Sequence, residues 1–263
     1  MKIGLKLTAL MVLLSLISAG AVGTILLVQA RKNITSLSHD KAIAIASEYS
    51  EEIRSSFSTY WYTAEMLASV MENYNYLKME DRRTFINTVI KEEVVKHPNI
   101  NGIWIIWEPN VLEGNDAQYI GMPGTCDTGR FAPYWYRDGN KILMHALSEE
   151  EFSNPKTGNY YHAPFNEKKT VIMNPYLDNV GGKKILNATI ASPIFAHSEN
   201  KKVLGVVGVD VNMETIQAIS REQKPFGVGF TAVFSNNGTI VAHFDPQRIG
   251  KNMLDTERDM AGE

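Results

Sequence analysis

The stretch GRFAPYWYRDG, residues 129–139, places three aromatic residues side by side between two arginines. Aromatic ring faces attract organic cations, and a nearby carboxylate supplies the counter-charge. Two later stretches add the same residue types, because NYYHAPF brings Tyr160 and Tyr161 and NPYLDN brings Tyr176 and Asp178. An aromatic box with one carboxylate predicts a site for an organic cation. The simpler alternative is that the rings pack in the core and that Asp178 is a turn residue ahead of two glycines.

Residues 130–136 are predicted to form a strand, so their side chains alternate between its two faces. Trp135 then lies on one face, with Tyr134 and Tyr136 on the other. Both faces are therefore aromatic, and a sheet that exposes so much ring surface to water is unusual. Burial in the core, a ligand cavity, or one on each face would account for the pattern.

Motifs of enzymes and metal sites are missing from the sequence. It contains no Gly-x-Ser-x-Gly elbow, no phosphate-binding loop and no His-Glu-x-x-His pair, and its six histidines are dispersed. The single cysteine, Cys126, is interpreted as a structural residue. The net charge is -3 and the basic residues are scattered, which argues against a nucleic-acid partner. We therefore expect no enzyme activity, no metal and no cofactor.

The N-terminal region is strongly apolar, since residues 7–30 contain no charged side chain. Such a run is long enough to cross a bilayer as a helix. Lys2 and Lys6 precede it and favour a cytoplasmic N-terminus, although Arg31 and Lys32 after it weaken the asymmetry. The alternative is a cleaved signal peptide, but the apolar part of such a peptide is usually only about 7 to 15 residues. The length favours an uncleaved anchor with the rest of the chain exported.

Residues 33–76 lack glycine and proline and carry apolar residues at helical spacing, which predicts one long helix. It is longer than a compact domain needs, so part of it is expected to be a stalk or a packing surface for a second copy. A second helix is predicted at residues 80–96, ending before a proline. The apolar run GIWIIWEP predicts a buried strand. Further strands, separated by turn sequences, are predicted at residues 130–136, 141–145, 170–176, 184–195 and 203–211.

Helices precede strands in this order, which predicts an α+β fold. Residues 212–221 are expected to form a helix with an asparagine cap. A second strand pair then follows, turning at Asn237 and Gly238. The predicted division is a cytoplasmic tip and membrane anchor at residues 1–30, a long helix with the main module at 31–222, and the start of an incomplete smaller module at 223–263.

The chain resembles the extracytoplasmic double Cache sensor region of bacterial methyl-accepting chemotaxis proteins. The likeness covers nearly the whole chain and is carried, in order, by the anchor, the long helix and the stretches GIWIIWEP, TGRFAPYWYRDG, NYYHAPF, NPYLDNVGGKKILNATIASPI and GVVGVDVNM. It implies a PAS-like, membrane-distal Cache module with an antiparallel sheet that binds small ligands, followed by a smaller membrane-proximal Cache module. It also implies a bacterial inner-membrane protein and a homodimer packed through residues 33 to about 76.

In the amino-acid sensors that the chain resembles, an Arg-x-Trp-Tyr motif holds the ligand carboxylate, and a later tyrosine and aspartate hold its amino group. Trp135 and Tyr136 match the Trp-Tyr pair, and Asp178 matches the aspartate. The arginine position falls on Pro133, which cannot hold a carboxylate. Arg130 and Arg137 are the nearby substitutes, although a strand directs Arg137 opposite to Tyr136. This departure favours amines or quaternary ammonium compounds over α-amino acids.

The predicted function is therefore the ligand-sensing region of a transmembrane chemoreceptor that takes a small amine, a quaternary ammonium compound or an amino acid. One alternative joins the same sensor to a histidine kinase or a diguanylate cyclase. Another is a membrane-anchored solute-binding protein with no signalling output. The candidate ligand-binding residues are Trp135, Tyr136, Asp178, Tyr161, Tyr176, Tyr134 and Arg130.

Overall fold

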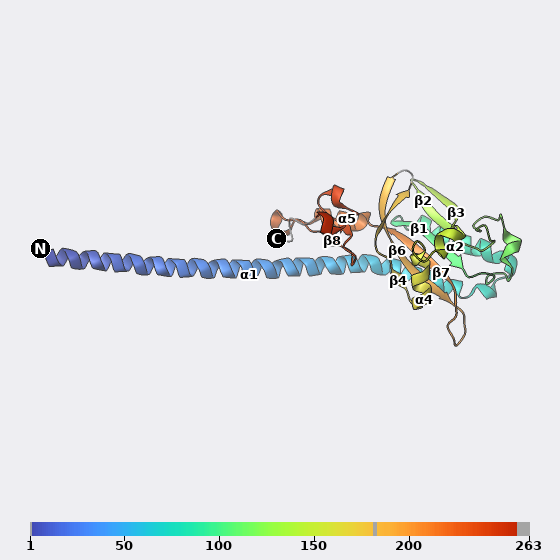
Figure 1. Ribbon diagram of the computed structural model, residues 1–263, viewed down its shortest axis with the longest axis horizontal. Coiled ribbons are helices and arrows are strands. Elements are labelled where there is room, and N and C mark those ends of the chain that lie inside the picture. Colours follow the sequence, from blue (N-terminus) through green and yellow to red (C-terminus); the bar gives the residue numbers. More distant parts are fainter. Residues whose placement is uncertain (1, 181–182, 257–263) are drawn as a thin grey trace. The chain divides into compact units, whose positions relative to one another are not determined.

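The computed structural model of the protein describes residues 2–180 and 183–256. The chain divides into two compact units, residues 1–52 and residues 53–263. Helix α1 (Lys2–Met71) supplies the described part of the first unit and continues into the second (Figure 1). The long helix predicted up to residue 76 is confirmed, although it ends at Met71 and a 3-10 turn follows at Tyr74–Tyr76.

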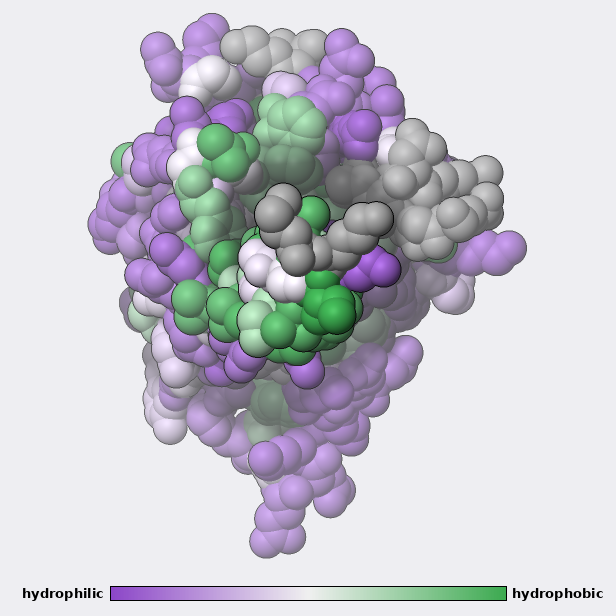
Figure 2. Space-filling model, turned by 90° about the vertical axis from the view of Figure 1, so that its left-hand side faces the viewer, coloured by the Kyte–Doolittle hydropathy of each residue, from purple (hydrophilic) through white to green (hydrophobic). Residues whose placement is uncertain are grey.

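The first unit carries the apolar segment predicted to be a membrane anchor. Among the described residues, α1 is the one helix that is long and apolar enough to cross a membrane. Figure 2 looks from the side on which α1 begins, and the surface nearest the viewer is mainly hydrophobic. Polar side chains in this segment bond within the helix, as the Ser18 hydroxyl donates to the Leu14 carbonyl at 2.7 Å and the Thr24 hydroxyl to the Gly20 carbonyl at 2.8 Å. Such internal bonding suits an apolar solvent.

The second unit is built on an antiparallel sheet with the order β3-β2-β1-β7-β6-β4, in which β5 also pairs with β6. The predicted strand at residues 170–176 is split into two, because Pro175 has no amide hydrogen for the ladder. The predicted strand at 130–136 begins later, at Pro133. The strands are β1 (Ile100–Trp107), β2 (Pro133–Asp138), β3 (Lys141–Ala146), β4 (Val171–Ile172), β5 (Tyr176–Val180), β6 (Lys183–Phe195) and β7 (Val203–Asn212).

The two faces of this sheet bury different side chains, as strand alternation requires. On β1, Ile103 and Ile105 pack with the last turns of α1 and with α2 in the main core. Trp104 and Ile106 point the other way, into a smaller cluster with side chains of α3 and α4. The second face therefore has the thinner cover and leaves room for a cavity. The helices are α2 (Arg82–Lys96), α3 (Glu149–Ser153), α4 (Asn159–Glu167) and α5 (Glu214–Glu222).

The last part of the chain begins with α5 and a short hairpin. The N-cap of α5 is Met213 and not the predicted asparagine, although the side chain of Asn212, one residue earlier, accepts a hydrogen bond from the Glu214 amide at 2.8 Å. Strands β8 (Val233–Phe234) and β9 (Ile240–Ala242) pair antiparallel, and Gly238 in their turn has φ +80°, as the predicted hairpin requires. The module boundaries at residues 30 and 222 remain predictions. The remaining elements are helix α6 (Met253–Thr256) and 3-10 turns at Met79–Asp81, Asp116–Tyr119, Pro225–Gly227 and Pro246–Arg248.

Candidate ligand-binding site

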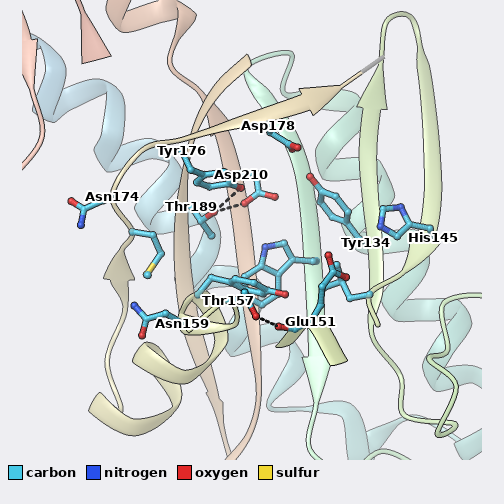
Figure 3. A pocket seen from close by; sticks show the side chains of 14 residues that line it. Tyr134, His145, Glu151, Thr157, Asn159, Asn174, Tyr176, Asp178, Thr189 and Asp210 are labelled. Atoms are coloured by element: carbon cyan, nitrogen blue, oxygen red, sulfur yellow. Dashed lines mark hydrogen bonds between the residues drawn. The ribbon is translucent and has the colours of Figure 1, made fainter. Parts of the chain in front are cut away.

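A cavity of about 520 Å³ opens on the sheet face that carries Trp104 (Figure 3). This volume lies within the range of about 300 to 1,000 Å³ that small-molecule sites occupy. Its lining combines aromatic rings, acidic groups and small polar groups from six strands and from the segments around α3 and α4. The lining residues are Trp104, Tyr134, His145, Leu147, Glu151, Thr157, Asn159, Tyr160, Met173, Asn174, Tyr176, Asp178, Thr189 and Asp210.

The aromatic walls of the cavity are held by ring contacts and by strand pairing. Trp104 and Tyr134 are directly opposite one another on β1 and β2. The Trp104 ring meets Tyr160 of α4 edge to face, with centroids 5.0 Å apart. Tyr134 stacks on Tyr136 at 5.4 Å, and the His145 imidazole meets Tyr134 edge to face at 5.3 Å. Each wall ring therefore has a second ring that fixes its orientation.

Asp210 of β7 is the most deeply placed acid of the cavity, with only 3% of the residue exposed. The Thr189 hydroxyl donates to its carboxylate at 2.6 Å and lies 3.2 Å from the Tyr176 hydroxyl. Burial raises the pKa of Asp210 to about 6, hydrogen bonds from Thr189, Tyr134 and Trp104 act against this rise, and the charge of Asp178 adds to it. Asp210 is therefore a carboxylate held in a dry place by neutral donors.

Two further acids face the same space. Asp178 lies beside Asp210, and Glu151 lies at the other end of the cavity (Figure 3). Burial raises the pKa values of the Tyr134 and Tyr176 phenols well above their usual range, and the charge of Asp210 adds to both shifts. The phenols are thus neutral hydrogen-bonding groups near neutral pH. None of the described residues that line the cavity is a lysine or an arginine.

This combination of groups is chemically suited to positive charge. Carboxylates with neutral donors around them attract a cation and repel an anion, and both effects are stronger away from bulk water. Aromatic faces add cation–π attraction, worth about 2 kcal/mol when the contact is desolvated. The cavity can therefore hold an ammonium group without a basic side chain of its own.

The structure brings three of the sequence-predicted residues together in this cavity: Tyr134, Tyr176 and Asp178. Tyr136 lies beside the cavity, where it stacks on Tyr134 and meets the His145 ring at 5.2 Å. Its role is to support a wall ring, and it is not among the described lining residues.

Trp135 lies on the opposite face of β2. Its indole nitrogen donates to the Asn87 side chain of α2 at 2.8 Å, and the Lys91 ammonium lies 5.1 Å from its ring centroid. Because neighbouring residues of a strand point to opposite faces, Trp135 and Tyr136 cannot both line one cavity. The structure therefore does not bring Trp135 to the cavity, and a ligand wall that contains this pair stays a prediction.

Arg130 and Tyr161 lie in a separate buried cluster. The Arg130 guanidinium donates to Glu149 at 2.9 Å, to Glu108 at 2.8 Å and to the Tyr161 hydroxyl at 2.7 Å, and its Nε donates to the Trp107 carbonyl. Burial acts to raise the pKa of Glu149, but the Arg130 charge and hydrogen bonds from Thr128, Cys126 and Arg130 together outweigh it and lower the pKa. These groups satisfy one another, so the structure does not bring Arg130 or Tyr161 to the cavity either.

Several lining residues were missed from the sequence. Asp210 is a lone acid in the valine-rich strand GVVGVDV, and Trp104 lies in the buried run GIWIIW. A single charge inside a strand that is otherwise apolar was the signal that could have found Asp210, since such groups are rarely buried without a purpose. Thr189 and His145 carry no comparable signal, because they reach the cavity only through the sheet order.

An antiparallel sheet with α1 and α2 on one face, and with α3, α4 and a cavity on the other, is the arrangement of a PAS-like, Cache-type sensor domain. Residues 86–218, half of the chain, match the family described as methyl-accepting chemotaxis protein-like, first PDC sensor domain. The chain belongs to this family, so the family predicted from the sequence is confirmed.

Individual relatives agree with this assignment. The chain is 27% identical over 202 residues to the methyl-accepting chemotaxis protein TlpQ of Pseudomonas aeruginosa, covering 72% of this chain and 28% of that one. It is 31% identical over 165 residues to McpA of Pseudomonas putida, covering 58% and 25%. It thus spans about a quarter of the length of these curated relatives. The solved extracellular domain of mmHK1S-Z2, assigned to a histidine kinase, matches with a TM-score of 0.72 and 27% identity, covering 83% of this chain and 78% of that one.

Proposed function

We propose that this chain is the ligand-sensing region of an inner-membrane chemoreceptor and that its cavity binds a small organic cation, such as an amine or a quaternary ammonium compound. The observation that carries this proposal is the lining: Asp178 and Asp210 face a space walled by aromatic rings, and no lysine or arginine is among the described lining residues. The buried Asp210 carboxylate, which is surrounded by neutral donors, favours a positive ligand.

The same lining argues against an α-amino acid, whose carboxylate needs a cationic partner. The family position for such an arginine is Pro133, at the start of β2. Arg130 is held by Glu108 and Glu149 in the buried cluster, and the Arg137 guanidinium donates to the Val94 carbonyl. Neither nearby arginine lines the cavity. A ligand that carries only positive charge is therefore favoured.

Signalling across the membrane would use α1, since the same helix contains the apolar segment and, further on, the residues that pack against the sheet. Ligand binding would bias two arrangements of this helix, by no more than the difference in ligand affinity between them. We expect a homodimer packed through α1. Membership of a chemotaxis-receptor family favours a chemoreceptor output, while the likeness to mmHK1S-Z2 supports a histidine kinase as the second candidate.

The proposal can be tested by thermal unfolding of the whole chain in detergent with amines, quaternary ammonium compounds and amino acids. A ligand present at 100 times its dissociation constant should stabilise the folded state by about 2.7 kcal/mol. Asp178→Asn and Asp210→Asn should remove the shift. Glu199→Gln, which neutralises an exposed acid in the turn between β6 and β7, is the matched control and should keep it.

Two results would contradict the proposal. If only ligands with a carboxylate stabilise the chain, the preference for organic cations is wrong, although the cavity still binds. If cations stabilise wild type, Asp178→Asn and Asp210→Asn equally, the site lies elsewhere.

A further inference from the structure

Two glycines lie under the two rings that form the floor of the cavity. Gly208 of β7 is the cross-strand partner of Trp104, and Gly102 of β1 lies between Tyr136 of β2 and Asp210 of β7. Neither glycine has a positive φ, so neither is required by the backbone conformation. The space above each glycine explains why no larger residue occupies the position.

The Trp104 indole lies directly on the backbone of Gly208. A Cβ added at Gly208 would overlap the Cε2 and Cζ2 atoms of Trp104 and would lie 2.6 Å from its Nε1. The same indole hydrogen-bonds Asp210. Glycine at position 208 therefore lets the indole lie flat and still reach the carboxylate two residues further along β7.

Gly102 has the same relation to Tyr134. A Cβ added there would overlap the Tyr134 ring and would lie 2.8 Å from the phenol oxygen, which also hydrogen-bonds Asp210. Ordinary contact with a Cβ begins at 3.4 Å. Any side chain at either glycine must therefore lift a floor ring into the cavity and away from Asp210.

We propose that Gly102 and Gly208 are specificity-determining positions, which set the depth of the cavity above Trp104 and Tyr134 and so the largest ammonium head group that it accepts. The proposal rests on the function proposed above. The two glycines act through the rings and touch no ligand themselves, so they are positioning residues.

The physical reason is that a close-packed site responds to the volume of one methyl group. Tyr160 and Tyr136 hold the floor rings from the side, so a lifted ring has no lateral space and must move toward the ligand. One methylene more or less in an apolar pocket changes discrimination by about tenfold or more. A raised floor should therefore exclude a tetrahedral quaternary head group while admitting a primary amine.

The test compares methylammonium with tetramethylammonium, whose charges are equal and whose sizes differ. Dissociation constants would be measured by calorimetry on the whole chain in detergent for wild type, Gly208→Ala and Gly102→Ala. Both variants should weaken tetramethylammonium binding by about tenfold more than methylammonium binding. The control is Val207→Ile, which adds one carbon on the same strand but toward the helix-packed face, and it should leave the ratio of the two constants unchanged.

If Gly208→Ala proves too unstable to measure, Gly102→Ala tests the assignment by itself, because its added Cβ meets the other floor ring. Equal losses for both ions in Gly102→Ala and Gly208→Ala, or no loss, would overturn the assignment of specificity while leaving the cation site intact. Failure of both ions to bind wild type would overturn it together with the proposed function.

Discussion

Two neighbouring residues of α4 belong to two very different polar groups. Tyr160 lines the cavity around Asp210, whereas the Tyr161 hydroxyl bonds Arg130 in the cluster with Glu108 and Glu149. Both groups combine buried acids with aromatic rings. They differ in that the cluster contains its own cation and the cavity lining, as far as it is described, contains no lysine or arginine.

This difference separates a structural group from a binding site. In the cluster the two glutamates and Arg130 neutralise one another, and its rings pack against the guanidinium, with the Phe152 centroid 4.8 Å away. In the cavity, Asp210 has neutral donors and a second acid beside it. The cluster is neutralised by its own arginine, whereas in the proposed function a bound cation would supply the counter-charge of Asp210.

The largest predicted effect is on stability and follows from removing Arg130 from its cluster with Glu108 and Glu149. Arg130→Met leaves the partly exposed Glu108 and Glu149 without their buried cation. Breaking a fully buried pair in this way typically costs about 3–5 kcal/mol of unfolding free energy, so we expect a loss toward the lower end of that range. Arg221→Met is the control, because Arg221 pairs with Glu214 at an exposed position and such pairs contribute less than about 1 kcal/mol. Chemical denaturation would measure both changes. A loss for Arg130→Met as small as for the control would show that the cluster is not structural.

The next largest predicted effect is on cation affinity and follows from removing the charge of Asp210 in the cavity. Asp210→Asn keeps the shape of the side chain but removes the charge, and losing one partner of a buried charge contact costs about 2 kcal/mol or more of binding. We expect cation affinity to fall by about 30-fold or more with no loss of folding. Calorimetric titration with tetramethylammonium would measure it. Unchanged affinity in a folded variant would remove Asp210 from the site.

The protonation of Asp210 predicts a pH dependence of intermediate size. Its pKa in the folded chain is about 6, above the ordinary aspartate value near 4, so its ionisation opposes folding as pH rises between these values. A cation binds the ionised form, so affinity should be highest above pH 6 and about tenfold weaker at pH 5.

Tetramethylammonium is the suitable probe for this pH series, because its own charge does not titrate. The stabilisation that it produces should grow between pH 5 and pH 7 in thermal unfolding. In Asp210→Asn this growth should disappear. A pH profile that is the same in wild type and variant would assign the dependence to another group.

The contrast also explains what the sequence could and could not predict. The long helix, most strands and the Asn237–Gly238 hairpin follow from local periodicity and turn residues, and these expectations are confirmed. The split at Pro175 was readable in principle, since proline cannot donate to a sheet ladder.

The site depended on information that is not local. Alternation in β2 correctly separates Trp135 from Tyr134 and Tyr136, but which face meets α2 is decided by packing far along the chain. Arg130 finds Glu108 and Glu149 on segments 22 and 19 residues away. Distance along the sequence therefore could not distinguish the acids that Arg130 neutralises from the acids that line the cavity.

The smallest predicted effect on cation affinity comes from Trp135, which matches the tryptophan of the Trp-Tyr pair in the amino-acid sensors. Trp135→Phe keeps an aromatic ring in the helix-packed core and loses only the hydrogen bond to Asn87, which contributes about 0.5–1.5 kcal/mol of stability. Cation affinity should stay within about twofold of wild type, because the side chain points away from Asp210 across the thickness of the sheet. Calorimetric titration of both Trp135→Phe and Tyr134→Phe, which removes a hydrogen-bond donor to Asp210, compares the effects of two adjacent residues on cation affinity. If Trp135→Phe weakens binding more than Tyr134→Phe, the ligand lies on the helix side of β2 and the open cavity is not the site.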